Sequence, residues 1–132
     1  MGTAVKALLD THALLWWLDG DERLPAAARG WIGDPAHIVL VSAASAWEIA
    51  TKFRIGKLPG AVEVVERFHA CLLEQAFTPL AITTDHALRA GKLPGPHRDP
   101  FDRMLIAQAQ TEHVPLISNE ILFDGYGIRR IW

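Results

Sequence analysis

The chain has 132 residues, of which 50% are hydrophobic and 21% are charged, and its formal net charge is −2. This length suffices for one domain with a buried core and is short for two, so we expect a single domain over residues 1–132. The near-neutral charge excludes a strongly basic protein that attracts nucleic acid through its overall field. The single cysteine, Cys71, excludes an internal disulfide framework and a cysteine-based zinc site within one chain.

The sequence carries no targeting or membrane signal. Its N-terminus lacks the basic start and the continuous apolar run of a signal peptide. No stretch approaches the roughly 18 apolar residues that a membrane-spanning helix needs. We therefore expect a cytoplasmic protein that does not enter a membrane.

Two short apolar runs in the first third of the chain predict buried strands. Val5 to Leu9 has no polar alternation, and His37 to Val41 is rich in β-branched residues. Each run stops abruptly at polar residues, the first of them at Asp10. Two helices are predicted between the strands, over Ala13 to Leu18 and over Pro25 to Ile32.

A helix is predicted after the second strand, from Ser42 to a stop at Gly56, and it contains Glu48. This glutamate has two interpretations. Ser45 and Glu48 fit the S-x-x-E capping box, in which the glutamate only binds the backbone at the helix start. Alternatively, Glu48 is a functional carboxylate close to the exit of the strand.

The middle of the chain predicts a long helix, a strand and a second helix. Val62 to Ala76 is amphipathic. Its core side is expected to consist of Val62, Val65, Phe68, Leu72 and Leu73. Phe77 to Ile82 is apolar, and Pro79 makes it an edge strand or an irregular one. Thr83 begins the next helix, which extends to about Ala90.

The stretch from His97 to Ala109 joins two carboxylates to the start of an apolar helix that extends to about Glu112. Asp99 suits the N-cap, Pro100 the first helical position, and Asp102 the third, where a carboxylate complements the helix dipole. Acids in a first turn are either caps or ligands, because backbone N–H groups point outward there. Both interpretations are open at this point.

The C-terminal part predicts two short strands, Val114 to Ser118 and Ile128 to Trp132, with Asn119 as a helix cap between them. Over the whole chain, strands alternate with helices. This order indicates an α/β fold with a mainly parallel central sheet of about five strands flanked by helices. Ligands bind such a sheet beyond the C-terminal ends of its strands.

Several segments bring carboxylates to that edge of the predicted sheet. The acids are Asp10, Glu48, Asp99, Asp102 and Glu120. A cluster of like charges repels itself, and a divalent cation would relieve the repulsion. Oxygen ligands favour Mg²⁺ or Mn²⁺ over zinc, although His12 and His97 leave a mixed-ligand site open. Such an ion supports phosphodiester hydrolysis by polarising a phosphoryl oxygen and activating water. Each acid also has an ordinary explanation as a cap or a surface charge.

The same residues resemble the PIN domain family, and more closely the VapC-type toxins of bacterial type II toxin–antitoxin pairs. The resemblance extends over essentially the whole chain and rests on four blocks in this order and spacing. They are Leu8 to His12, Ser45 to Ile49, His97 to Arg103, and Leu116 to Glu120 with the terminal Ile131 and Trp132. The resemblance implies one PIN domain over residues 1–132, with a three-layer α/β fold.

The resemblance also implies a Mg²⁺- or Mn²⁺-dependent endoribonuclease, a hydrolase that a cognate antitoxin protein inhibits and that forms a homodimer. By position it assigns the catalytic and metal-binding carboxylates to Asp10, Glu48 and the pair Asp99 and Asp102, without choosing within the pair. Glu120 stands where the family usually has aspartate. Its longer side chain makes its role as a metal ligand the least secure.

Four further residues are expected around these acids. Thr11 and Ser118 resemble hydroxyl groups that support the carboxylates, and His97 flanks the acidic pair. Arg103 is expected to pair with a carboxylate or to contact phosphate of the RNA substrate.

Two other functions stay open on the sequence alone. A catalytically degenerate module, of which Glu120 would be a sign, would bind RNA or an antitoxin-like protein without cutting. A nuclease of the same fold could act on DNA instead of RNA.

Overall fold

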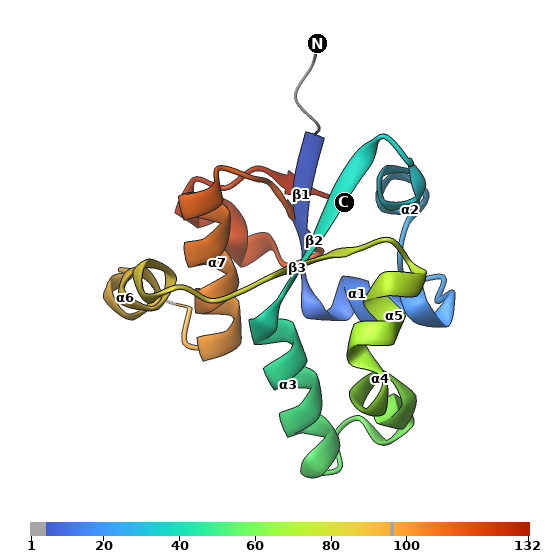
Figure 1. Ribbon diagram of the computed structural model, residues 1–132. Helices are drawn as coiled ribbons and strands as arrows, with labels where there is room; N and C mark the ends of the chain where they lie inside the picture. Colours follow the sequence, from blue (N-terminus) through green and yellow to red (C-terminus); the bar gives the residue numbers. More distant parts are fainter. Residues whose placement is uncertain (1–4, 96) are drawn as a thin grey trace.

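The computed structural model describes residues 5–95 and 97–132. Its strands form one parallel sheet in the order β3-β2-β1-β4-β5 (Figure 1). The strands are β1 (Val5–Leu9), β2 (His37–Ser42), β3 (Thr78–Leu80), β4 (Leu116–Ile117) and β5 (Arg130–Ile131). The predicted α/β fold with a parallel sheet of five strands is therefore confirmed. Pro79 lies in β3 at an edge of the sheet, as predicted, because proline cannot donate to a ladder on both sides.

Helices cover both faces of the sheet. They are α1 (Thr11–Asp19), α2 (Ala26–Gly33), α3 (Ala43–Arg54), α4 (Val62–Glu66), α5 (Phe68–Glu74), α6 (Thr84–Lys92) and α7 (Pro100–Glu112), with the 3₁₀ helices η1 (Pro59–Ala61) and η2 (Ile121–Tyr126). In Figure 1, α1, α2, α4 and α5 lie on one side of the strands, and α6 and α7 lie on the other. None of these helices has the length and apolar character that crossing a bilayer requires.

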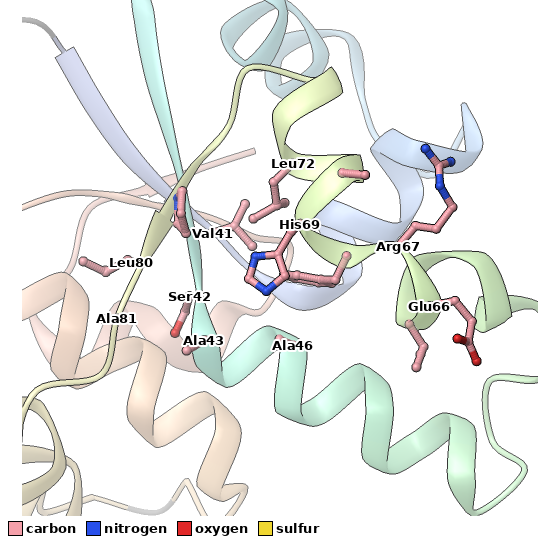
Figure 2. Close-up of a pocket in the computed structure, with 14 residues that line it drawn as sticks. Val41, Ser42, Ala43, Ala46, Glu66, Arg67, His69, Leu72, Leu80 and Ala81 are labelled. Atoms are coloured by element: carbon pink, nitrogen blue, oxygen red, sulfur yellow. The ribbon is translucent and has the colours of Figure 1, made fainter.

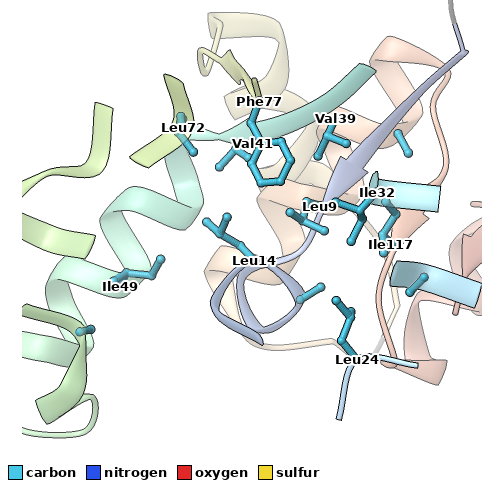
Figure 3. Packing of buried hydrophobic residues seen from close by; sticks show 14 residues of the cluster. Leu9, Leu14, Leu24, Ile32, Val39, Val41, Ile49, Leu72, Phe77 and Ile117 are labelled. Carbon is cyan, nitrogen blue, oxygen red and sulfur yellow. The ribbon is translucent and has the colours of Figure 1, made fainter. Parts of the chain in front are cut away.

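Two hydrophobic cores result from the alternation of side chains along the central strand β1. Leu9 packs with Val41 and with apolar residues of α1, α2 and α5 in the first core (Figure 3). Leu8 packs with Leu105 of α7 and Phe123 of η2 in the second. Because both faces of β1 are buried, its sequence is a continuous apolar run and not an alternating one.

The predicted single helix over Val62 to Ala76 is wrong. The structure contains α4 and α5 there, separated at Arg67, whose φ of −124° and ψ of 34° interrupt the helix. Two of the predicted core residues, Val62 and Leu73, are exposed. The interruption turns the second helix relative to the first, so the apolar residues of the two do not form one continuous stripe.

The C-terminal ends of the strands define the edge of the sheet where polar residues gather. β1 ends directly before Asp10, and β2 ends at Ser42. The helices α1 and α3 begin at this edge, and Figure 1 shows α7 beginning at the same end of the sheet.

Candidate active site

Asp10 combines a capping role with deep burial. Its Oδ1 accepts a hydrogen bond of 2.7 Å from the backbone N–H of Ala13 and thereby caps α1. The residue is 5% exposed, and burial raises the pKa of its carboxyl group. A hydrogen bond from the Ser118 side chain opposes this rise, whereas the charge of Glu48 adds to it. Asp10 is therefore held firmly in place, with a second carboxylate close enough to repel it.

Glu48 lies on α3 and is buried, with an exposed fraction of 3%. The capping-box interpretation is wrong, because Ser42 caps α3 by accepting a hydrogen bond from the Ala44 N–H at 2.9 Å. Glu48 does not cap α3, and its Oε2 contacts Nζ of Lys52. Its Oε1 is buried and has no hydrogen-bond partner among the described residues.

Asp99 is the N-cap of α7, as predicted. Its Oδ1 accepts hydrogen bonds from the N–H groups of Phe101 at 2.8 Å and Asp102 at 3.1 Å. One oxygen of this carboxylate is thus committed to the backbone. Asp102, one turn later, makes no such bond, and its Oδ2 lies 3.1 Å from Nε2 of His97 without the alignment of a hydrogen bond.

Asp102 shows that the predicted acids converge. Burial, and after it the negative charges of the four other predicted acids, together raise its pKa to about 7. These are, in order of effect, Asp99, Glu48, Asp10 and Glu120. We call these five residues the acidic cluster. Carboxylates that are separated in sequence by up to 110 positions therefore influence one another at one edge of the sheet.

Glu120 has a local structural role within this cluster. Its side chain accepts a hydrogen bond of 3.1 Å from the N–H of Leu122 and caps η2. The predicted cap at Asn119 is therefore wrong by one residue. The N–H of Glu120 donates to the Ser118 hydroxyl at 2.9 Å, and the same side chain hydrogen-bonds Asp10. Ser118 thus links the Glu120 segment to the exit of β1.

Two other expected supporting residues are engaged differently. The Thr11 hydroxyl donates to the Ser45 hydroxyl at 2.9 Å and so joins α1 to α3. The Arg103 guanidinium donates to three backbone carbonyls, at 3.2 Å to Ala90, at 2.9 Å to His97, and also to Leu93. Arg103 therefore binds the backbone of the loop before α7 and not the carboxylate that had been expected.

The acidic cluster has the oxygen donors that a hard divalent cation prefers. Its side chains are not yet arranged around a common point. In residues 5–95 and 97–132, no group of three or more Asp, Glu, His or Cys side chains is arranged to hold a metal ion. Yet the cluster offers only carboxylate oxygens, carries mutual repulsion, and includes the orphaned, buried Oε1 of Glu48. An ion would satisfy that oxygen and relieve the repulsion, and it would require side-chain adjustment.

Lys52 contacts Glu48 at this site, a pairing that the sequence analysis did not predict. Its position four residues after Glu48 on a predicted helix was the available signal, since such residues are neighbours on one helix face. The structure confirms the contact through the Nζ to Oε2 pair.

A pocket of about 720 Å³ lies elsewhere, between the end of β2, the start of α3 and α5 (Figure 2). Its wall is mostly apolar and includes Val41, Ala46, Leu72 and Leu80, and His69 also lines it. None of the acidic cluster lines it. The pocket is therefore separate from the acidic cluster.

Comparison with known proteins identifies the fold family. Residues 7–127 match the PIN domain family. The chain belongs to the PIN domain family. The resemblance noted in the sequence is thereby confirmed, and the acidic cluster lies within the matched residues.

Individual relatives agree with this assignment. Over 63 residues the chain is 41% identical to Ribonuclease VapC16 of Mycobacterium tuberculosis. This alignment covers 45% of the present chain and 40% of VapC16. The alignment thus spans less than half the length of this curated relative.

Solved structures share the fold at low sequence identity. VapBC2 from Rickettsia felis, bound to a DNA fragment from its promoter, matches 97% of this chain and 100% of its own with a TM-score of 0.66 and 12% identity. VapC20 of Mycobacterium tuberculosis, described as a toxin that cleaves the sarcin–ricin loop, matches 92% of this chain and 95% of its own with a TM-score of 0.62 and 17% identity.

Proposed function

We propose that this PIN domain is a Mg²⁺- or Mn²⁺-dependent endoribonuclease that hydrolyses RNA phosphodiester bonds, and that it acts as the toxin of a type II toxin–antitoxin pair. The observation that carries this proposal is the convergence of the acidic cluster, expressed in the raised pKa of Asp102. The fold gathers helix starts, and with them their caps, at this edge of the sheet, but Glu48 and Asp102 cap no helix. A cation site gives these two acids a reason to lie among the others.

Three carboxylates would hold the ion: Asp10, Glu48 and Asp102. Asp99 is the weaker candidate of its pair, because one of its oxygens already binds the start of α7. When bound, a divalent ion polarises a phosphoryl oxygen and lowers the pKa of water. Asp10 is oriented for this task by the Ala13 N–H and the Ser118 side chain, and Glu48 by the helix α3. One oxygen of Glu120 accepts a hydrogen bond from the Leu122 N–H, so Glu120 would contribute less to binding the ion than these three acids.

The relatives support the choice of substrate and partner. VapC16 is named a ribonuclease, VapC20 is described as a toxin that cleaves the sarcin–ricin loop, and a matching structure from Klebsiella pneumoniae is described as a toxin–antitoxin complex. We propose by analogy an RNA substrate, a cognate antitoxin protein and a homodimer. RNA is a cytoplasmic substrate, so the proposal places the protein in the cytoplasm.

A catalytically degenerate module is the second candidate. It is favoured by the observation that no three metal-binding side chains in the described residues are arranged around a common point. Such a module would bind RNA or an antitoxin-like protein without cutting. A nuclease with a preference for DNA is the third candidate.

One assay separates the three candidates. Purified, antitoxin-free protein is incubated with labelled single-stranded RNA and DNA of the same sequences, with Mg²⁺, with Mn²⁺ or with EDTA. We expect RNA to be cut in both metals and to stay intact in EDTA. Preferential cutting of DNA would support the third candidate, and binding without any product in either metal would support the second.

A further inference from the structure

Glu48 is a buried acid whose charge needs compensation. Its side chain is 4% exposed, and an ionised carboxylate at that depth is costly unless a partner neutralises it. Lys52 Nζ contacts Oε2, whereas Oε1 is buried and has no hydrogen-bond partner among the described residues. Lys52 therefore compensates one oxygen of this carboxylate, and the other oxygen is left without a hydrogen bond among the described residues.

The helix α3 itself places Lys52 at Glu48. The two residues are four positions apart, and a glutamate that precedes a lysine by one turn is the favourable order for such a pair. The Lys52 side chain is 28% exposed and so borders on solvent. Its flexible stem allows the ammonium group to move away while the helix stays in place.

The surroundings of Glu48 are otherwise negative. Its charge raises the pKa of both Asp10 and Asp102. Among the side chains that the structure describes, Lys52 is the one lysine or arginine whose nitrogen lies within 4.0 Å of a carboxylate of the acidic cluster. Lys52 thus stands where a cation is needed.

We infer that Lys52 is the internal counter-ion of Glu48 in the metal-free protein, and that it gives up this carboxylate when a divalent cation binds there. The inference rests on the metal site of the proposed function. An ammonium group and a divalent ion repel each other, so they compete for Glu48. Lys52 is therefore a positioning residue, which compensates the charge of the buried Glu48 at the expense of metal affinity.

The first test measures Mn²⁺ binding by the loss of the electron paramagnetic resonance signal of free Mn²⁺. The variants are Lys52→Met, which keeps the length of the side chain and removes its charge, and the matched control Lys6→Met at the opposite end of β1, where the lysine is exposed. We expect Lys52→Met to bind Mn²⁺ roughly tenfold more tightly than the wild type, and Lys6→Met to stay within about twofold. Unchanged or weaker binding by a folded Lys52→Met protein would overturn the inference.

The second test needs no variant and so remains decisive if Lys52→Met fails to fold. Wild-type protein is labelled with an amine-reactive ester in EDTA and in Mg²⁺, and the labelling rates of Lys52 and Lys6 are read by mass spectrometry. We expect Mg²⁺ to raise the rate several-fold at Lys52 and to leave that at Lys6 unchanged. Equal rates at Lys52 would contradict the release of its ammonium group.

The two proposals fail in different ways. Metal-dependent RNA cleavage together with unchanged Mn²⁺ affinity of Lys52→Met would refute only the counter-ion role. A wild-type protein that binds no Mn²⁺ would refute the metal site of the proposed function, and the counter-ion inference with it.

Discussion

Asp102 makes the electrostatics of the acidic cluster measurable in the metal-free protein. Its pKa rises from 3.8 to about 7 on folding, through burial and the neighbouring charges of Asp99, Glu48, Asp10 and Glu120. Between about pH 4 and pH 7 the folded state therefore binds more protons than the unfolded state. The free energy of unfolding must fall as the pH rises through this range.

The variant Asp102→Asn removes this titration and should flatten the dependence. We expect wild-type protein in EDTA to lose on the order of 2 kcal/mol between pH 4.5 and pH 8, since solvent reaches part of the carboxyl group and reduces the full effect. Urea unfolding across this pH range measures the loss. The variant should lose markedly less and be the more stable protein at pH 8.

A surface acid provides the control for this experiment. Arg130 lowers the pKa of Asp124, so Asp124 contributes stability above its unfolded pKa and loses it on acidification, which is the opposite sign. Asp124→Asn should leave the decline between pH 4.5 and pH 8 in place. An Asp102→Asn protein that declined as steeply as the wild type would show that Asp102 is not repelled as described.

Several individual residues could be predicted from sequence because their signals are local. The cap at Asp99 follows from the order Asp, Pro and an apolar helix, and the structure confirms it. Glu48 could not be assigned, because Ser45 offers an equally good local cap pattern. In the structure Ser42 is the N-cap of α3, and Ser45 lies inside the helix.

Arg103 holds the loop before α7 in place through hydrogen bonds to its backbone. Its guanidinium reaches carbonyls on both sides of the loop, at the end of α6 and directly before α7. Gly95 in the same loop has a φ of +102°, and a Cβ there would lie 2.6 Å from the Tyr126 hydroxyl. This close packing positions the start of α7, and with it Asp99 and Asp102.

Replacing Arg103 by lysine should loosen this loop. A single ammonium group cannot serve three carbonyls in the fixed geometry of a guanidinium. We expect Arg103→Lys to lower the free energy of unfolding by about 2 kcal/mol and to speed amide hydrogen exchange in residues 91–95 and 97–99. Arg98→Lys, at an exposed position of the same loop, is the control and should change neither. Unchanged amide hydrogen exchange in Arg103→Lys would mean that the hydrogen bonds of Arg103 do not order the loop.

Helices and strands were predictable to different degrees. The buried strands β1 and β2 were recognised because their apolar runs end at polar residues. The break between α4 and α5 has no glycine or proline to announce it. Arg67 at the break pairs with Glu63 at 3.1 Å and Glu74 at 2.8 Å, a set of contacts that a periodicity pattern does not reveal.

The arrangement of the complete chain explains why the members of the acidic cluster could be predicted from the sequence, whereas their contacts could not. A parallel sheet brings all strand exits to one edge, so the convergence of the acids follows from fold class alone. The order of strands, which sets β1 between β2 and β4, depends on long-range packing. The contacts of Arg103 with the loop also depend on it, whereas the contact of Glu48 with Lys52 is local to α3. These contacts decide which side chains are free to bind an ion.

The proposed function requires these carboxylates to form one hydrolytic centre. The measurement that tests it most directly is the rate of RNA cleavage in Mn²⁺ by wild-type protein, Asp10→Asn, Asp102→Asn and the control Asp85→Asn, whose acid is exposed on α6. We expect each of the first two variants to fold like the wild type and to lose activity by a factor of about 100 or more. Asp85→Asn should cleave at the wild-type rate. Retained cleavage by folded Asp10→Asn and Asp102→Asn would contradict the account, because the acidic cluster would then be structural and the hydrolytic centre would lie elsewhere.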